Sequence, residues 1–375
     1  MKKSFLILSF GTGILSAQTS TFITDGDWLD AANWDTGAVV PDNQTAFINA
    51  NAIVDRNTGT ANNDNPSRIE IGSGPGASGS VTVTGGTLSG AHGGGNGVFV
   101  GANGGNGTLR VEEGATYRTQ GENLQLAVGD FSGGIGFVSV AGVMQIYKFL
   151  NVNNGTFEML PTGKCNLFNS NDPSSIGAEG TLSFVIDGSD VGSLERSNTN
   201  GLNLIIDPAA TLKINLGGDF ELNDSWALAR YTSLSGQFKE GESFTNEQGY
   251  TFAVNYGSGN NDAVTLTLTS DSERPKISNL TATPAAISAG ASSALRWSAS
   301  NFDSLTLDPG EVDLTLLTET TIFPTESTTY TLTAAKGAAS VSSEVTVVVD
   351  ELPEINSFTA SELLIAPGES TTLAW

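Results

Sequence analysis

The sequence contains few basic residues, one histidine and one cysteine. Its 375 residues include 16 Lys and Arg against 40 Asp and Glu, which gives a formal net charge of −24 at pH 7. A field of that sign repels phosphate backbones and anionic lipid headgroups, so binding to nucleic acid or to a membrane surface is not expected. One Cys and one His exclude a disulfide framework, a Cys/His zinc site and any catalytic scheme that needs two histidines.

Long apolar runs are scarce as well, and the clearest one lies near the N-terminus. Residues 5–15 are mostly apolar and follow Lys2 and Lys3. Eleven residues are too few to cross ~30 Å of hydrocarbon, and the polar, turn-rich sequence that follows argues against a buried core helix. The pattern predicts a signal peptide over residues 1–17. We therefore expect an exported protein, secreted or at the cell surface, with no membrane insertion within this chain.

Glycine is abundant, at 45 residues against 12 prolines, and part of this excess follows a repeat. Segments 69–90, 98–119 and 126–147 align with starts 29 and 28 residues apart. Each has an apolar residue followed by Gly, a Gly-rich turn, an alternating strand and a further Gly. One unit has too few apolar residues to bury a face alone, so the units must stack with each strand paired to the next. A four-stranded propeller blade needs about 40 residues, so the repeat predicts a right-handed parallel β-solenoid.

The sequence on either side of these repeats predicts the ends of the solenoid. Residues 18–68 are expected to form an N-terminal cap, and residues 148–268 to form degenerate coils followed by a C-terminal cap. Alternation continues at 181–186, 202–206 and 212–216 without the glycine turns. The alternating ends of residues 228–268 predict closing strands that cover the last open edge.

These residues resemble the β-helix regions of the passenger domains of autotransporter-like exported bacterial proteins. The similarity rests on the opening DWLDAANWDTGAVVPDNQTAFIN at 27–49, on the TGGTL-type units, and on the closing segment that runs from YTSLSGQF to NNDAVTLTL. It covers roughly residues 22–268. The resemblance implies a fold and an exported location, but it implies no single activity because many functions share this fold.

The composition changes at residues 269–274, which we read as a linker before a second domain. Residues 275–297 align with 353–375 at a constant offset of 78, with nine identities in 23 positions. Short alternating strands about every ten residues predict an all-β sandwich over 275–349. Residues 353–375 would be the start of a second copy. Because a third of a sandwich cannot bury its strands, the chain is expected to be a fragment of a longer protein.

The second domain resembles the immunoglobulin-like modules of secreted and surface bacterial proteins. The resemblance rests on LRW at 295–297, SLTLDPG at 304–310 and TTYTLTA at 328–334. No cysteine pair is available, so such a sandwich would depend on apolar packing alone. Trp297 is the predicted core residue.

Candidate chemistry is sparse. Oxygen-rich turns make Asn171, Asp172, Asp187 and Asp190 calcium candidates, and similar clusters occur at 25–27 and 62–65. None matches an EF-hand loop or the calcium-binding nonapeptide of other solenoids, and Asn and Asp are ordinary turn formers. No other cofactor is expected.

A structural and a functional interpretation can each be given for the lone histidine, the lone cysteine and two tryptophans. His92 lies in a glycine-rich turn and has no identifiable carboxylate to orient it as a general base. Cys165 has no His or Cys nearby, which favours a small buried side chain over a nucleophile. Trp28 and Trp34 could stack on sugars, but their place before the first repeat favours a hydrophobic lid.

These observations leave three functional hypotheses. The favoured one is a non-enzymatic exported surface or matrix scaffold of the adhesin type, with a solenoid stalk and immunoglobulin-like spacer or binding modules. The alternative is the noncatalytic N-terminal region of a larger secreted polysaccharide-active enzyme, whose catalytic domain lies beyond residue 375. An active site within the solenoid is the weakest, because the repeats hold few charged side chains. No catalytic residue is assigned, and the expected partner is a polysaccharide or another cell-surface ligand.

Overall fold

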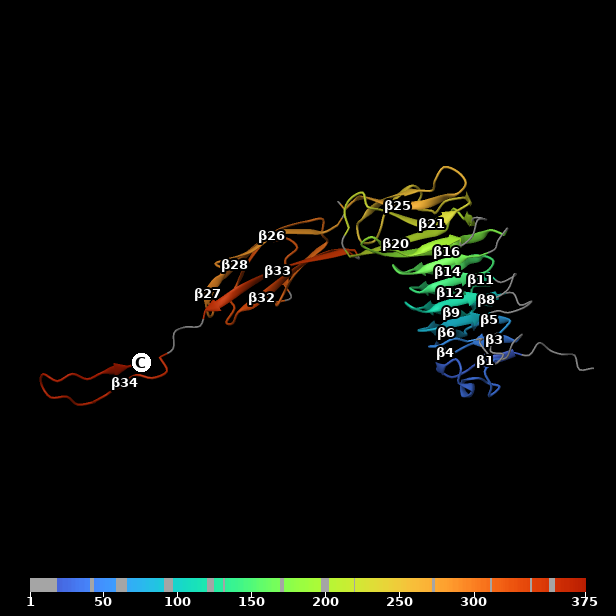
Figure 1. Ribbon diagram of the computed structural model, residues 1–375. Coiled ribbons are helices and arrows are strands. Elements are labelled where there is room, and N and C mark those ends of the chain that lie inside the picture. Colours follow the sequence, from blue (N-terminus) through green and yellow to red (C-terminus); the bar gives the residue numbers. More distant parts are fainter. Residues whose placement is uncertain are drawn as a thin grey trace, which may run out of the picture. The chain divides into compact units, whose positions relative to one another are not determined.

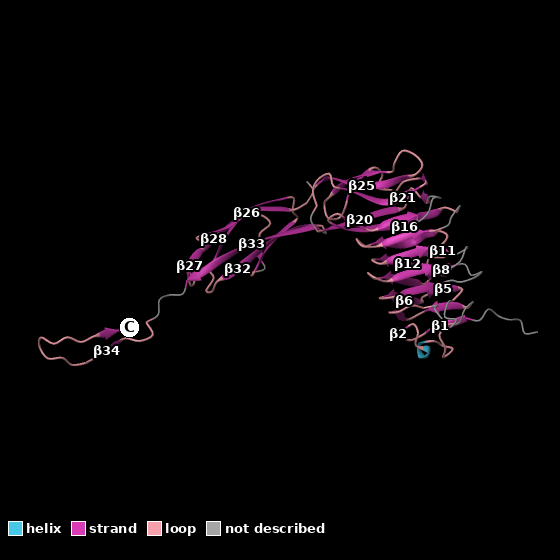
Figure 2. Ribbon diagram, viewed as in Figure 1, coloured by secondary structure: helices cyan, strands magenta, loops and turns pink. Residues whose placement is uncertain are grey.

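The computed structural model describes most of the chain (Figure 1). The described residues are 19–40, 44–58, 66–90, 97–119, 125–130, 132–168, 172–196, 202–218, 220–271, 274–310, 312–337, 339–350 and 355–375. The predicted signal peptide, His92 and Asn171 lie outside them. The described chain forms two compact units, one within Met1–Asn246 and Thr251–Ser270, the other comprising Glu247–Tyr250 and Asp271–Trp375. Within these residues the only helix is the 3-10 turn η1, Ala31–Asn33, so the protein is all-β (Figure 2).

The first unit is the predicted parallel β-solenoid, whose strands lie on three faces. The strands of the first face are β1 (Thr19–Phe22), β3 (Thr45–Ile48), β5 (Arg68–Ser73), β8 (Gly97–Ala102), β11 (Gln125–Val128), the first parts of β14 (Leu150–Met159) and β16 (Ser174–Asp187), β19 (Asn203–Ile206) and β22 (Ser233–Ser235). Those of the second face are β2 (Gly26–Asp27), β4 (Asn51–Val54), β6 (Ser78–Val83), β9 (Asn106–Val111), β12 (Ile135–Val140), the later parts of β14 and β16, and β20 (Thr211–Gly217). Those of the third face are β7 (Thr87–Gly90), β10 (Thr116–Thr119), β13 (Val143–Ile146), β15 (Lys164–Leu167), β18 (Ser193–Arg196) and β21 (Ser225–Tyr231).

The coils stack in register, so equivalent side chains form rows along the solenoid. One interior row on the second face pairs Val81 with Leu109, Leu109 with Val138, and Val138 with Phe157. All of these side chains are buried. Because side chains alternate between the two faces of a strand, every second residue of these strands points to solvent. The alternation in the sequence therefore produces both the apolar interior and a regular outer surface.

Glycines at the corners let neighbouring coils approach closely. Gly72 and Gly101 are the next-to-last residues of β5 and β8, and Gly129 directly follows β11. Their φ values are 59°, 73° and 67°. A Cβ atom on Gly101 would lie 2.0 Å from the carbonyl oxygen of Ile135 on the next coil. Only glycine accepts both the left-handed backbone and this contact. The apolar-Gly pattern of the repeat is therefore a requirement of the stacking.

Both ends of the stack are covered by residues of the same unit. At the first end, Phe22, Trp28 and Trp34 pack in an aromatic cluster. At the other end the parallel pairing gives way to antiparallel pairing of β21 with β25 (Asp262–Ser270). The sheet continues through β24 (Thr251–Asn255) and β23 (Ser243–Thr245). These antiparallel strands cover the end that a stack of parallel coils would leave open.

A short hairpin interrupts the regular coils after β16. β17 (Asp190–Val191) pairs antiparallel with the end of β16.

The second unit is a two-sheet β-sandwich. One sheet contains β26 (Lys276–Thr283), β28 (Ser293–Ser300) and β31 (Glu319–Ile322). The other contains β27 (Ala286–Ser288), β33 (Ala339–Asp350), β32 (Thr328–Lys336), β29 (Ser304–Asp308) and β30 (Val312–Asp313). Side chains from both sheets, among them Trp297, Leu305 and Leu332, form one apolar core. The sandwich holds together through apolar packing, since no cysteine lies in this unit.

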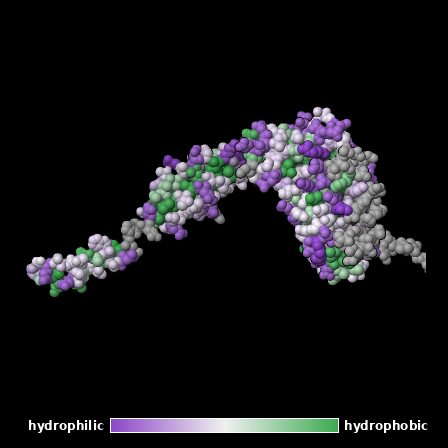
Figure 3. Space-filling view, viewed as in Figure 1, coloured by the Kyte–Doolittle hydropathy of each residue, from purple (hydrophilic) through white to green (hydrophobic). Residues whose placement is uncertain are grey.

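The last described segment repeats the beginning of this sandwich in sequence and in register. Ala360 of β34 (Thr359–Ala360) pairs with Leu373 of β35 (Leu373–Ala374), and Ala282 pairs with Leu295 at positions 78 residues earlier. The environment differs, because Leu295 is fully buried whereas Leu373 is 47% exposed. Figure 3 shows hydrophobic residues on the surface of this segment. Among the described residues, no second sheet pairs with or packs on this hairpin as one does on its counterpart.

Candidate ligand-binding groove

The outer side of the second face carries small polar residues on its first coils. β4, β6 and β9 present Asn51, Ser80 and Thr108 in one outward row, since Asn51 pairs with Ser80 and Ser80 with Thr108. A second outward row, two residues earlier on β6 and β9, contains Ser78 and Asn106. Neighbouring strands of a sheet lie about 4.8 Å apart. Hydroxyl and amide groups are thus repeated at that interval along the stack.

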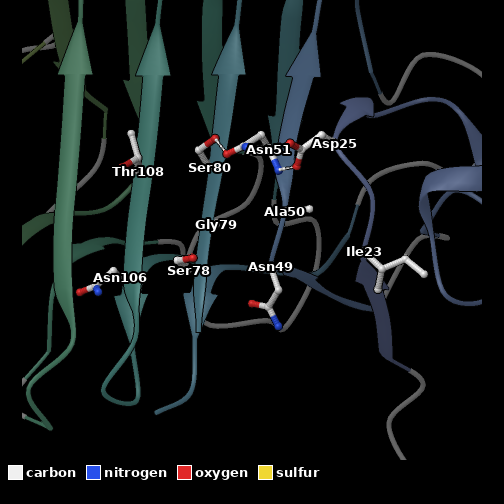
Figure 4. Close-up of a pocket in the computed structure, with 10 residues that line it drawn as sticks. All are labelled: Ile23, Asp25, Asn49, Ala50, Asn51, Ser78, Gly79, Ser80, Asn106 and Thr108. Carbon is white, nitrogen blue, oxygen red and sulfur yellow. Dashed lines mark hydrogen bonds between the residues drawn. The ribbon is translucent and has the colours of Figure 1, made fainter. Parts of the chain in front are cut away.

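A shallow groove of about 510 Å³ lies over these rows (Figure 4). The residues that line it are Ile23, Asp25, Asn49, Ala50, Asn51, Ser78, Gly79, Ser80, Asn106 and Thr108. Figure 4 shows Thr108, Ser80, Asn51 and Asp25 in one row, and Asn106, Ser78 and Asn49 in another. The groove therefore extends across the segment before β2 and the strands β4, β6 and β9.

Hydrogen bonds hold the first row in place. Both carboxylate oxygens of Asp25 accept hydrogen bonds from Asn51, one from its backbone N at 2.8 Å and one from its Nδ2 at 3.0 Å. Asn51 Oδ1 in turn accepts from Ser80 Oγ at 2.7 Å. The donors on Asn51 stabilise the ionised carboxylate and hold the pKa of Asp25 below its ordinary value. Three side chains from three coils are thereby oriented before any ligand arrives.

The second row and the end of the first have unused hydrogen-bonding groups. The side chains of Asn49, Ser78, Asn106 and Thr108 form no hydrogen bond within the part of the chain that the structure describes. Two are amides with donors and an acceptor each, and two are hydroxyls that can act as either. All four line the groove, so it offers these groups to a ligand.

The charged and apolar side chains of the groove are concentrated at one of its ends. Asp25 is the one ionisable residue in its lining, and the flank beside it is Ile23, whose side chain is 56% exposed. Beyond the other end, Phe137 follows Thr108 in the same outward row. Arg110 lies over the Phe137 ring, with its guanidinium carbon 5.1 Å from the ring centroid. The groove itself is therefore polar and weakly negative between an aliphatic and an aromatic neighbour.

The calcium candidates lie elsewhere. Asp187 and Asp190 face each other across the β16–β17 hairpin, both exposed. Asp172 precedes β16 and pairs with Lys148 at 2.7 Å. Within the described residues no three His, Cys, Asp or Glu side chains are grouped so that they could hold a metal ion. Calcium binding stays a prediction from the sequence.

The three tryptophans singled out in the sequence are buried. The Trp28 and Trp34 rings meet edge to face at a centroid distance of 5.1 Å, and Trp34 Nε1 donates to the Trp28 carbonyl at 2.9 Å. Because both rings are enclosed in the cap, neither offers a face to a sugar. Trp297 lies in the sandwich core. The structure therefore places all three in packed interiors.

Cys165 is also fully enclosed. It lies on β15 inside the solenoid, and burial raises the pKa of its thiol well above the ordinary range. A thiol that resists ionisation is a poor nucleophile at neutral pH.

The sequence analysis did not predict most of the residues that line the groove. It singled out Asp25, as part of an acidic cluster, but not Asn51, Ser80, Asn106 or Thr108. The available signal was the outward position of the alternating strands, where small polar residues stand between apolar ones. Polar residues at outward positions are expected of any solvated sheet. Only the register of the coils shows that these particular ones face the same space.

The comparisons with known proteins add little about function. No protein-family model and no solved structure matches the chain. An uncharacterized protein of Ruminiclostridium cellulolyticum is 35% identical over 127 residues, which are 33% of this chain and 35% of that protein. The chain thus matches about a third of the length of this relative. Among the described residues, no helix has the length and apolar content needed to cross a bilayer.

Proposed function

We propose that this chain is a non-enzymatic scaffold exported to the cell surface or the extracellular matrix. The solenoid acts as a stiff stalk similar to the β-helix of autotransporter-like proteins. The sandwich acts as a spacer or binding module of the immunoglobulin-like type. Export is supported by Lys2, Lys3 and the apolar residues 5–15.

The observation that carries the proposal is the closed stack. Parallel strand pairing runs without a break from β1 to β22, and coverage at both ends comes from the same unit. Each internal coil is hydrogen-bonded to two neighbours, so no coil can open without breaking ladders on more than one face. A structure of this kind resists local unfolding and proteolysis, and a stalk outside the cell needs that resistance.

Two measurements on the full chain test the proposal. In a time course with proteinase K, we expect a fragment that contains residues 19–270 to outlast residues 355–375 by about tenfold or more, because cleavage requires local opening. Digestion of both at the same rate would contradict the stalk. Reducing-sugar assays against plant and bacterial polysaccharides are expected to show no product, and release of product would show that the chain is an enzyme.

The export part is tested separately by fusing residues 1–30 to alkaline phosphatase, which is active only outside the cytoplasm of a bacterial host. Activity is expected for the natural sequence and not for a Leu8→Asp variant, because a charge interrupts the apolar segment. Equal activity of both fusions, or none in either, would remove export from the proposal.

A further inference from the structure

We propose that the groove on the first coils binds a neutral polysaccharide chain lying along the solenoid axis. The groove is the one described above, between Asp25 and Thr108 on one row and Asn49 and Asn106 on the other. This assignment does not depend on the scaffold function, because it rests on the local geometry of four coils.

The spacing of the groove's polar groups favours a chain of repeated units. Equivalent side chains recur on every coil at about 4.8 Å, which is close to the advance of one pyranose unit along an extended sugar chain. Four side chains without a hydrogen-bond partner in the described part of the chain, those of Asn49, Ser78, Asn106 and Thr108, supply donors and acceptors along the groove. A polysaccharide presents hydroxyl groups that both donate and accept, so it can pair with amides and hydroxyls alike. A ligand with a single polar end would leave most of these groups unused.

Part of the site is fixed in advance, which lowers the entropy cost of binding. Asn51 is held by two hydrogen bonds to Asp25 and accepts one from Ser80. The lining strands β6 and β9 pair over their full lengths. A ligand therefore meets a row of oriented groups on a rigid sheet. Ile23 beside this row offers an apolar surface on which the C–H face of a sugar ring can pack.

Charge restricts the ligand to a neutral chain. No Lys or Arg lines the groove, Asp25 contributes a carboxylate, and the whole chain carries a net charge of −24. A polyuronate or a sulfated glycan would bring its own negative charges to this surface and would be repelled. Volume agrees with a short stretch of such a chain, since about 510 Å³ lies within the usual range of ligand sites.

Affinity electrophoresis of the full chain tests the proposal. Native gels are cast with neutral hydroxyethyl cellulose, mixed-linkage β-glucan, galactomannan or arabinoxylan, and polygalacturonate serves as the anionic probe. At least one neutral polymer is expected to retard the protein, with a Kd of about 0.01–1 mM, whereas polygalacturonate is not. No retardation by any neutral polymer, or equal retardation by polygalacturonate, would overturn the assignment.

A double variant locates the binding on the protein. Asn106→Ala with Thr108→Val removes two groups that form no side-chain hydrogen bond to any described residue. Folding should therefore be retained, as circular dichroism and thermal melting can verify. Thr181→Val is the matched control, because Thr181 lies in the same outward row as Thr108 but on β16, outside the groove. Retardation should weaken at least about tenfold in the double variant and stay unchanged in the control. Equal loss in both, or no loss in the double variant, would contradict the proposal.

Discussion

Asp35 and Thr21 form two hydrogen bonds that close the outer edge of the first coil. Thr21 N donates to Asp35 Oδ1 at 2.9 Å, and Asp35 N donates to the Thr21 carbonyl, also at 2.9 Å. The neighbouring Phe22 forms an antiparallel bridge with Trp34. β1 is the terminal strand of its sheet, and an unprotected terminal strand would pair with another molecule. The segment after η1 thus occupies this edge, and we expect it to hinder end-to-end association.

Replacing Asp35 by Ala should weaken this edge. The variant leaves Thr21 N without its acceptor, so we expect about 0.5–1.5 kcal/mol less stability to urea and a greater tendency to dimerise. Sedimentation velocity over a range of concentrations measures the second effect. Thr36→Ala is the control, since the Thr36 hydroxyl donates to the Ala38 carbonyl within the same turn rather than to β1. A monomeric Asp35→Ala protein at all concentrations would show that the rest of the cap suffices.

Two glycines with similar backbone angles should differ greatly in their tolerance of a methyl group. Gly101 and Gly114 have φ values of 73° and 79°, but a Cβ at Gly101 meets Ile135 O at 2.0 Å, whereas one at Gly114 meets nothing within 4 Å. Gly114→Ala should therefore cost only the left-handed strain of about 1–2 kcal/mol. Gly101→Ala should cost a further 1–3 kcal/mol for the forced separation of coils. Urea unfolding followed by circular dichroism compares them, and equal losses would contradict this account of the repeat.

Much of the solenoid could be predicted because its fold depends on sequence patterns within a single coil. The positions of Gly72, Gly101 and Gly129 and the apolar alternation after them follow from single-coil geometry, so the sequence alone indicated parallel stacking. At the C-terminal end of the solenoid the sequence predicted closing strands, but it did not predict that β21 and β25 would pair antiparallel. The register of this pairing depends on contacts between residues about 40 positions apart, such as Trp226 with Leu266.

The groove could not be predicted, because it depends on which outward residues coincide. Asn51 and Ser80 are 29 residues apart in a region where loop lengths vary, and a shift of one residue would turn one of them inward. The role of the two cap tryptophans, in contrast, could be predicted from the sequence. Trp28 and Trp34 lie six residues apart, and their place before the first repeat was enough to suggest a cap.

The two cap tryptophans should respond differently to the same substitution. Trp34 Nε1 donates to the Trp28 carbonyl, while Trp28 Nε1 has no partner among the described residues. Both variants to Phe lose similar volume, but Trp34→Phe also leaves a buried carbonyl unpaired. We expect Trp34→Phe to be less stable than Trp28→Phe by about 1–2 kcal/mol in urea unfolding. The reverse order would mean that volume, rather than the hydrogen bond, determines the stability of the cap.

The hydrogen bonds to Asp25 also predict how the groove responds to acid. The folded state lowers the pKa of Asp25, so ionisation and folding support each other. The stabilisation from this group is complete above the unfolded pKa of about 3.9 and is lost as the pH falls through the lower folded value. The amide resonance of Asn51, which donates to Asp25 Oδ1, should therefore stay constant from pH 7 to 5 and titrate with a midpoint below about 3.9.

An NMR titration of the isotopically labelled full chain measures this midpoint, and Asp25→Asn is the control in which the transition should disappear. The same experiment distinguishes the titration of Asp25 from that of Asp262, another carboxylate of the solenoid whose pKa is lowered. Its pKa is lowered by the backbone N–H groups of Ser258 and Ala263, so its own transition should persist in the Asp25→Asn variant. A midpoint at or above the ordinary aspartate value for the Asn51 amide would show that the row from Asp25 to Ser80 is not ordered in solution. The groove would then lack the orientation on which its proposed binding of sugar chains depends.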